Sequence, residues 1–381
     1  MAAASNIFPT RNSSLGKRLR CWNVYPPHCV RQAGRSPLLC SFRSTLKLKL
    51  PGTSVRKSHS SSAQDMADAG LSWATTNGDL IALSKSRNAP CTVRGNRIAF
   101  ALRDHLSRAG ISAAGPSLTG VLRHLIIRTT KDDREAVAML VVTRNDKSLR
   151  KPVRALLQSR REGGRPDGFF INIHDSLDPF MTGPKTIRIE GRSHVRETVG
   201  GLSYLISPAA FFQTNARAAA VLQRCVMESV CGARRVLDLY CGSGLFSLPL
   251  AAAGVRVDGI DENSQAIRDA KMNVRLNRIP EGRVRFWLAR VEDGLARTPQ
   301  EGWDAVILDP PRQGCRKPIL AAVFQDIAPL RVVYVSCNPD TLALELSAIL
   351  KAGYRAERIE AVDMFPHTEH IETVVRLVRK G

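Results

Sequence analysis

The second half of this chain alternates apolar stretches with amphipathic ones, and this alternation constrains the fold more than any other feature of the sequence. Buried strands are predicted at 234–240, 255–261, 284–290, 303–309 and 331–336, and helices at 213–230, 245–254 and 264–277. Strands that alternate with helices form a parallel sheet covered by helices on both faces. We therefore predict an α/β domain at 206–381, with a last strand at 373–378.

A smaller α/β domain is predicted before it, at 91–205. Helices are expected at 97–106 and 148–161, paired strands at 120–130 and 135–144, and further strands at 168–175 and 186–191. Pro152 must lie in the first turn of its helix, because a proline in a helix interior removes a backbone hydrogen bond. Residues 65–90 are polar and are expected to form a linker.

Positive charge is concentrated at the start of the chain. The 56 Lys and Arg residues exceed the 34 Asp and Glu residues and give a net charge of +22, and residues 1–64 hold 11 basic residues and no acidic one. A basic, Ser-rich and acid-free composition is typical of an organellar transit peptide, and the uncharged first ten residues favour a chloroplast over a mitochondrion. The alternative is a disordered basic arm that binds nucleic acid. In either case residues 1–64 are expected to be disordered.

The rest of the chain restricts the classes of partner and site. It keeps a net charge of +11, which favours a polyanionic partner such as RNA. No run of 18 apolar residues occurs, so we expect no membrane-spanning helix and no membrane partner. The nine cysteines include no CxxC pair, which gives no support to a zinc ribbon or a thioredoxin-type site. We expect free thiols and no metal site.

A glycine-rich loop follows the first strand of the larger domain. Gly242 and Gly244 let the backbone approach a ligand closely, and the Asp261 carboxylate at the end of the next strand is suited to accept hydrogen bonds from ribose hydroxyls. Ser247 occupies the third glycine position of the pyrophosphate-binding pattern. The loop therefore favours S-adenosylmethionine, which has no phosphate, over NAD. A purely structural turn remains the alternative.

Two further strands of the predicted sheet end in polar residues. Asp309 begins a stiff Asp-Pro-Pro-Arg loop, and Cys337 follows the strand 331–336. Because ligands bind beyond the carboxyl ends of parallel strands, Asp309 is expected beside the cofactor, although a turn or helix-capping carboxylate is the alternative. Arg312 has the chemistry to pair with Asp309 or with an RNA phosphate.

Cys337 is the strongest candidate for a nucleophilic thiol. Nearby cations or a helix N-terminus would activate it, whereas a buried thiol would pack only as a small apolar side chain. Cys241 would crowd the cofactor and Cys315 lies in a polar loop, so both rank below Cys337.

The last polar cluster stands before the final strand. A carboxylate beside a thiol suits a nucleophile with a general base, which makes Glu372 a candidate base. His367, Glu369 and His370 crowd the same turn, and a solvated turn is the alternative interpretation.

Five segments, taken in order, resemble the signature segments of the RNA uracil-5-methyltransferase family, whose members make 5-methyluridine in transfer or ribosomal RNA. These segments are FFQTN (211–215), LDLYCGSGLFSLPLA (237–251), DPPRQG (309–314), SCNPDT (336–341) and DMFPHTEHIE (363–372). The resemblance implies a class I Rossmann-like methyltransferase domain at 206–381. It also implies a small α/β RNA-binding domain at 91–205.

The resemblance also implies a mechanism. Cys337 would add to carbon 6 of a uracil that has left its stack, and Glu372 would remove the proton from carbon 5. S-adenosylmethionine would supply the methyl group. The positions that match the family's cofactor contacts are Gln213, Tyr240, Gly242, Gly244, Asp261 and Asp309.

The chain departs from many relatives in two respects. It has no recognisable β-barrel RNA-binding domain, and only Cys91 matches a ligand position of the iron–sulfur cluster that some relatives hold. We therefore expect no cluster, and we expect a monomer that acts on RNA, with ribosomal RNA slightly favoured over transfer RNA. Two alternatives stay open, namely methylation of cytosine or an exocyclic amine, and a non-catalytic RNA-binding assembly factor that keeps the fold.

Overall fold

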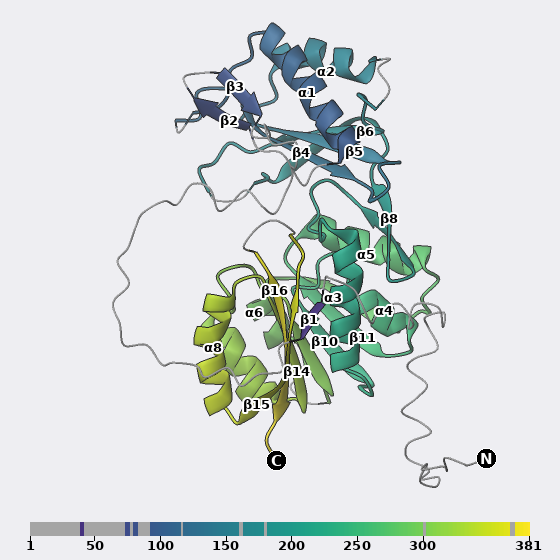
Figure 1. The fold of residues 1–381 in the computed structure, drawn as a ribbon, viewed down its shortest axis with the longest axis vertical. Helices are drawn as coiled ribbons and strands as arrows, with labels where there is room; N and C mark the ends of the chain where they lie inside the picture. The colour runs from purple at the N-terminus through teal and green to yellow at the C-terminus, as the bar shows by residue number, and fades with distance from the viewer. Residues whose placement is uncertain are drawn as a thin grey trace, which may run out of the picture.

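The protein is seen here in a computed structural model. It describes residues 39–41, 73–76, 79–82, 92–115, 117–159, 163–178, 181–299, 302–365 and 370–381. A smaller upper unit and a larger lower unit are visible in Figure 1. No helix in these ranges is long and apolar enough to cross a membrane.

The lower unit is built on an eight-stranded sheet in the order β1-β15-β16-β14-β13-β10-β11-β12. Its parallel strands confirm the predicted α/β fold class: β10 pairs with β11 and β13, β11 pairs with β12, and β13 pairs with β14. The bounds of these strands are β10 (Arg235–Leu239), β11 (Arg256–Asp261), β12 (Val284–Leu288), β13 (Ala305–Leu308) and β14 (Arg331–Ser336).

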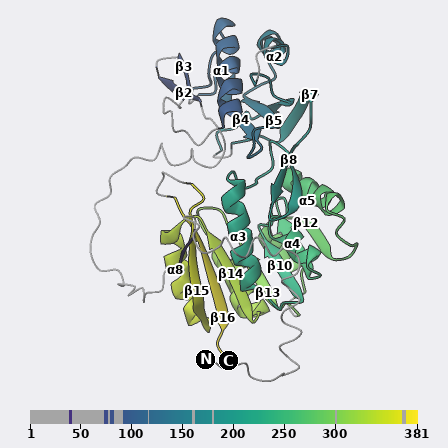
Figure 2. The same cartoon turned by 45° about the vertical axis from the view of Figure 1, so that its right-hand side comes forward.

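Helices cover both faces of this sheet, as the views in Figures 1 and 2 show. One face packs against α3 (Ala216–Ser229), α4 (Ser247–Ala252) and α5 (Ser264–Leu276). The other packs against α6 (Val291–Ala296), α7 (Lys317–Ala321) with its π-helical continuation Ala322–Ile327, and α8 (Pro339–Lys351). Every residue of β13 is buried, since the strand is enclosed on both sides.

The sheet ends in antiparallel strands, which the strand–helix alternation did not predict. β16 (Glu372–Arg379) lies between β14 and β15 (Tyr354–Val362) and runs antiparallel to both. The physical reason is the connection: a direct return from β15 to β16, without a crossover helix, joins only antiparallel neighbours. This reversal brings the start of β16 to the carboxyl end of β14.

Three short segments lie in the part of the chain that was expected to stay outside the fold. β1 (Leu39–Ser41) pairs antiparallel with β15, and β2 (Trp73–Thr76) pairs with β3 (Asp79–Ala82). The structure therefore differs from the expectation of a disordered head and linker at these residues. The outer edge of β15 offers free backbone donors and acceptors, which is what an added strand needs.

The upper unit has a four-stranded sheet with helices on one face. The sheet order is β4 (Leu122–Thr129), β5 (Ala136–Val142), β6 (Gly168–Ile173), β7 (Lys185–Gly191). α1 (Val93–Arg108) and α2 (Arg150–Leu157) pack on one face through an apolar core. Thr92 caps α1, because its hydroxyl accepts a hydrogen bond from the Gly95 amide. The opposite face of the sheet turns toward the lower unit (Figure 1).

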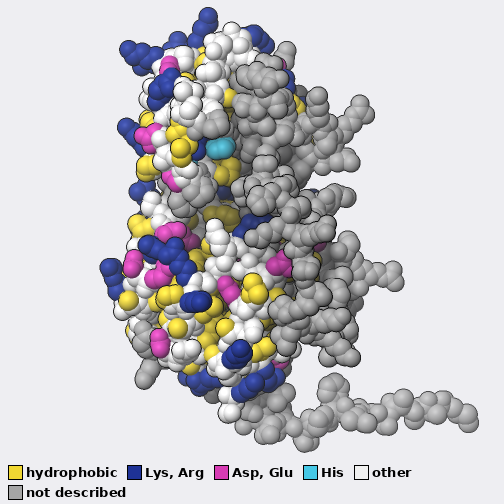
Figure 3. Space-filling view, turned by 90° about the vertical axis from the view of Figure 1, so that its left-hand side faces the viewer, with side chains coloured by type: hydrophobic (Ala, Val, Ile, Leu, Met, Phe, Trp, Pro, Cys, Tyr) yellow, Lys and Arg dark blue, Asp and Glu magenta, His cyan; other side chains and the backbone are white. Residues whose placement is uncertain are grey.

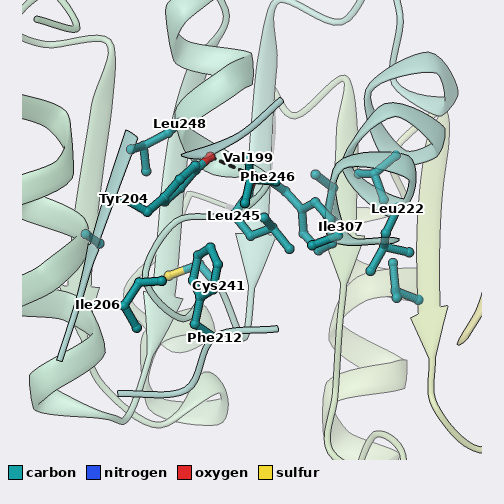
Figure 4. Close-up of a cluster of buried hydrophobic side chains, with 14 of the residues drawn as sticks. Val199, Tyr204, Ile206, Phe212, Leu222, Cys241, Leu245, Phe246, Leu248 and Ile307 are labelled. Carbon is teal, nitrogen blue, oxygen red and sulfur yellow. Dashed lines mark hydrogen bonds between the residues drawn. The ribbon is translucent and has the colours of Figure 1, made fainter. Parts of the chain in front are cut away.

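A hairpin of β8 (Val195–Val199) and β9 (Leu202–Ile206) joins the two units, and the sequence analysis had not resolved it. Although it falls before the predicted boundary at residue 206, it packs on the lower unit. Val199, Tyr204 and Ile206 meet the side chains of Cys241 and Leu245 in the core drawn in Figure 4.

Two asparagines of α5 fasten this hairpin by its backbone. Asn273 accepts a hydrogen bond from the Leu205 amide and donates one to the Leu205 carbonyl, at 2.7 and 3.2 Å. One turn later, Asn277 does the same for Ser203, at 2.9 and 2.7 Å. Side-chain amides thus take the place that a neighbouring strand would have.

Removing either amide should destabilise the fold. Asn273→Ala leaves buried backbone groups of Leu205 without partners, at a cost of about 1–3 kcal/mol. Asn277→Ala should cost less, because Asn277 is half-buried and water can replace its bonds. Urea unfolding of both variants measures the difference. Equal stability of the two variants and the wild-type chain would contradict this account.

Candidate active site

A shallow recess opens to solvent at the carboxyl ends of β10 and β13. Its walls come from the segment 211–213, from the loop that follows β10, and from Asp309. Four of the residues that were predicted to contact a cofactor line it, namely Gln213, Tyr240, Gly242 and Asp309. This is the edge at which parallel sheets bind ligands.

The loop after β10 has an unusual backbone. Tyr240, Gly242 and Gly244 all adopt positive φ angles, of 64°, 52° and 90°. A Cβ atom at Gly244 would lie 1.9 Å from Cδ1 of Leu248, so that position excludes larger residues by space as well as by φ. A non-glycine residue in this region stores about 1–3 kcal/mol of strain. Tyr240 therefore holds a strained conformation at the wall of the recess.

Asp261 is fixed beside this loop by two backbone amides. Its carboxylate accepts hydrogen bonds from the amide of Gly242 at 2.9 Å and from the amide of Asn263 at 2.8 Å. One bond falls on each oxygen, which leaves each oxygen with acceptor capacity for a ribose hydroxyl. The burial of Asp261 raises the pKa of its carboxyl.

Asp309 lines the recess, and three further carboxyl groups lie close enough for their negative charges to act on it. Burial raises the pKa of Asp309 well above its usual value, and the carboxylates of Glu372, Asp238 and Asp261 raise it further. Burial likewise raises the pKa of Asp238 to about 7. A positively charged ligand would offset this repulsion. These carboxyl groups therefore fit S-adenosylmethionine, which carries a positively charged sulfonium and a positively charged ammonium group.

The sequence analysis did not select Asp238 as a site residue, although its position in the sequence is unusual. It is a charged residue in the middle of an apolar strand, and it is fully buried. Its Oδ2 accepts a 2.5 Å hydrogen bond from Ser247, while Oδ1 is buried without a hydrogen-bond partner in the described part of the protein.

Both predicted catalytic residues lie at the junction of β14 and β16. Ser336 pairs with Thr373 in the antiparallel register. Cys337 is the residue after β14, and Glu372 is the first residue of β16, so both lie next to this last pair of the register. Cys337 is half-buried and Glu372 is buried, and the charge of Glu372 acts on Asp309.

Hydrogen bonds tie the five sequence motifs together. Asn338 and Thr341 both donate to the carbonyl of Arg312, at 3.2 and 3.3 Å, which joins the loops after β13 and β14. Asn215 donates to the carbonyl of Met364, and Ser243 donates to the carbonyl of Phe211. The amide of Asp309 also donates to the carbonyl of Leu239, at 3.4 Å, so hydrogen bonds connect all five motifs.

The rival cysteines differ from Cys337 in burial. Burial raises the pKa of Cys241 well above its usual value and raises the pKa of Cys315 to about 12. Both thiols are therefore held protonated. His370 lies beside the Phe365 ring, whereas His367 and Glu369 lie outside the described residues.

Comparisons with known proteins agree with this geometry. Residues 297–380 match the family described as tRNA (Uracil-5-)-methyltransferase, and residues 208–327 match the methyltransferase small domain. The crystal structure of a Pyrococcus abyssi tRNA (uracil-54, C5)-methyltransferase with S-adenosyl-L-homocysteine superposes with a TM-score of 0.64. It is 29% identical and covers 82% of this chain and 76% of its own. The chain is therefore similar to the RNA uracil-5-methyltransferase family.

Bacterial RNA methyltransferases are also similar to this chain. An uncharacterised RNA methyltransferase of Bacillus cereus is 33% identical over 265 residues, and one of Gloeobacter violaceus is 35% identical over 262 residues. Each alignment covers 68% of this chain and 56% of the relative. The chain thus spans little more than half the length of these relatives.

The described residues form no group of three or more His, Cys, Asp or Glu side chains that could hold a metal ion. Cys21, Cys29 and Cys91 lie outside the described residues, and only the strand that contains Cys40 is described. The absence of an iron–sulfur cluster in this chain therefore stays a prediction.

The pKa of Asp238 makes stability depend on pH. The folded protein binds a proton at Asp238 more tightly than the unfolded chain, so this group stabilises the fold below about pH 4 and loses that contribution as the pH rises to about 7. Asp238→Asn keeps an oxygen that accepts the hydrogen bond from Ser247, and it should reduce the loss of stability between about pH 4 and pH 7. Thermal unfolding at pH values between 4 and 8 measures how the stability of each variant depends on pH. The exposed substitution Asp326→Asn is the control, and an equal slope in both variants would refute the assignment.

Proposed function

We propose that this chain transfers a methyl group from S-adenosylmethionine to carbon 5 of uridine in RNA. The observation that supports the proposal is the β14–β16 register, which brings the half-buried Cys337 and the buried Glu372 to the same end of these two strands, where the carboxylate of Glu372 acts on Asp309 of the recess. The family match over residues 297–380 includes both Cys337 and Glu372.

Cys337 is the proposed nucleophile. It directly precedes α8, whose N-terminus is capped by Asn338 with hydrogen bonds from the amides of Asp340 and Thr341. The partial positive charge of a helix N-terminus favours a thiolate over a thiol. Addition of this thiolate to carbon 6 of uracil turns carbon 5 into a nucleophile.

Glu372 is the proposed general base. It removes the proton from carbon 5 once that carbon carries the methyl group, and elimination then releases the Cys337 thiolate. The charge repulsion with Asp309 favours proton uptake in this carboxylate pair.

The cofactor site follows from the residues around the recess. Gln213, Tyr240, Gly242 and Asp309 would line the bound cofactor, Gly244 would shape the loop, and Asp261 would accept hydrogen bonds from the ribose. S-adenosylmethionine, when bound, supplies a methyl group that its positive sulfur activates.

RNA is the proposed partner, with ribosomal RNA slightly favoured over transfer RNA, and the protein is proposed to act as a monomer. Beyond residue 64 the chain keeps an excess of basic residues. On the face shown in Figure 3, Lys and Arg side chains lie on both units, and the surface is hollowed where the units meet. Such a surface suits a phosphate backbone.

The covalent step can be trapped. RNA that contains 5-fluorouridine has no proton at carbon 5 for Glu372 to remove, so the wild-type chain should form a stable adduct with it. Cys337→Ala should form no adduct and lose activity by more than about 1,000-fold, while Cys315→Ala should form the adduct normally. Denaturing gels and peptide mass spectrometry measure the adduct.

Glu372→Gln tests the role of the general base while the nucleophile stays intact. This variant should still attack uracil but should release product about 100- to 10,000-fold more slowly, so an adduct accumulates on ordinary uridine RNA. An adduct through another cysteine, or activity in Cys337→Ala, would favour a cytosine or amine methyltransferase. Absence of any adduct in the wild-type chain would favour an assembly factor.

The destination is proposed to be an organelle, with the chloroplast favoured over the mitochondrion, because residues 1–64 are basic, Ser-rich and acid-free. Fused to a fluorescent reporter, these residues should direct it into one of the two organelles. Sequencing organellar RNA with and without the protein should show the loss of a 5-methyluridine. A cytosolic reporter would contradict the targeting proposal, and an unchanged modification map would contradict the activity.

A further inference from the structure

We propose that a second hollow, between the upper and lower units, binds one ribonucleotide of the RNA at a position other than the target uridine. The inference rests on the proposed function, since it assumes that RNA is the partner. The hollow has about 500 Å³ of empty space and shares no lining residue with the recess described above.

The hollow combines an apolar surface with polar groups, as a nucleotide site requires. Its upper wall is the open face of the β6–β7 pair, from which Phe170, Thr186 and Arg188 contribute side chains. Phe170 is 7% exposed and gives a base an apolar contact at the wall, and the guanidinium of Arg188 is suited to bind phosphate. Among the described residues, no ion-pair partner is found for Arg188, so its charge is available to a polyanion.

The lower wall is held in place by one buried carboxylate. Asp269, which is fully buried, accepts hydrogen bonds from His194 at 3.2 Å, from Gln265 at 3.1 Å and from the hydroxyl of Ser207 at 2.6 Å. All three donors line the hollow. A wall whose side chains are already fixed loses little conformational entropy when a ligand binds.

This hollow adjoins the active site through one stretch of chain. Ser207, Pro208 and Ala209 line the hollow, and residues 211–213 line the cofactor recess. Arg128 of the upper unit donates to the carbonyls of Pro208 and Ala210, and Asn263 donates to the carbonyl of Ala209. The segment is thus tied to both units, and an RNA strand that places its target uracil near Cys337 has a second fixed point close by.

The test uses the full chain and a 20-nucleotide oligouridylate that contains 4-thiouridine. Arg188→Ala should weaken binding about 3- to 10-fold. The slope of the logarithm of the binding constant against the logarithm of the salt concentration should become about one unit less steep, because one phosphate contact is lost. Thr186→Tyr fills the hollow and should weaken binding by a similar or larger factor. Ultraviolet crosslinks in the wild-type chain should map to the peptides around residues 186–194 and 265.

Lys185 supplies matched controls on the same strand, because adjacent residues of a strand project to opposite faces. Lys185→Ala and Lys185→Tyr should bind the oligouridylate within about twofold of wild type. Binding of S-adenosylhomocysteine should be unchanged in all four variants, which separates a lost nucleotide contact from misfolding.

The outcomes distinguish this inference from the proposed function. Equal binding by the Arg188 and Lys185 variants, or crosslinks only outside the hollow, would overturn the inference even if the chain makes 5-methyluridine. A clear difference between the variants would support the nucleotide site even if no 5-methyluridine is found.

Discussion

The antiparallel pairing of β14 with β16 is the contact on which the rest of the site depends. A purely parallel sheet would bring only strand carboxyl ends to this edge, whereas the reversed β16 brings the start of a strand there. Glu372, the first residue of β16, therefore lies at the same end of the sheet as Cys337, the residue after β14, and it pairs with Val362 of β15. A shift of one residue in this register would turn Glu372 to the other face of the sheet.

Carboxyl groups crowd the same edge, and this crowding opposes the stability of the fold. Asp238, Asp261, Asp309 and Glu372 are close enough for their charges to raise the pKa of Asp309. A fold selected only for stability would place apolar or paired groups there. Such stored repulsion is useful where a cation must be bound and a proton must be moved.

The sequence was sufficient to predict the parallel strands, because each is a short apolar run ended by a glycine or a polar residue. It also predicted that Asp309 and Cys337 each follow a strand at the same edge of the sheet. It did not predict the direction of β16, since apolar runs carry no sign of direction. Nor did it reveal the β8–β9 hairpin, which is held by the amides of Asn273 and Asn277, because such pairing depends on a helix about 70 residues further along the chain.

The hydrogen bonds of Asn273 and Asn277 connect α5 to the β8–β9 hairpin. The first turn of this helix is capped by Asn263, which also bonds to Asp261 of the cofactor site, and its last turns grip β9. A helix transmits displacement along its axis with little bending. Asp261 at one end of α5 and the β8–β9 hairpin at the other are thus held by the same helix, so the loop side of the recess and the attachment of the upper unit share one rigid support.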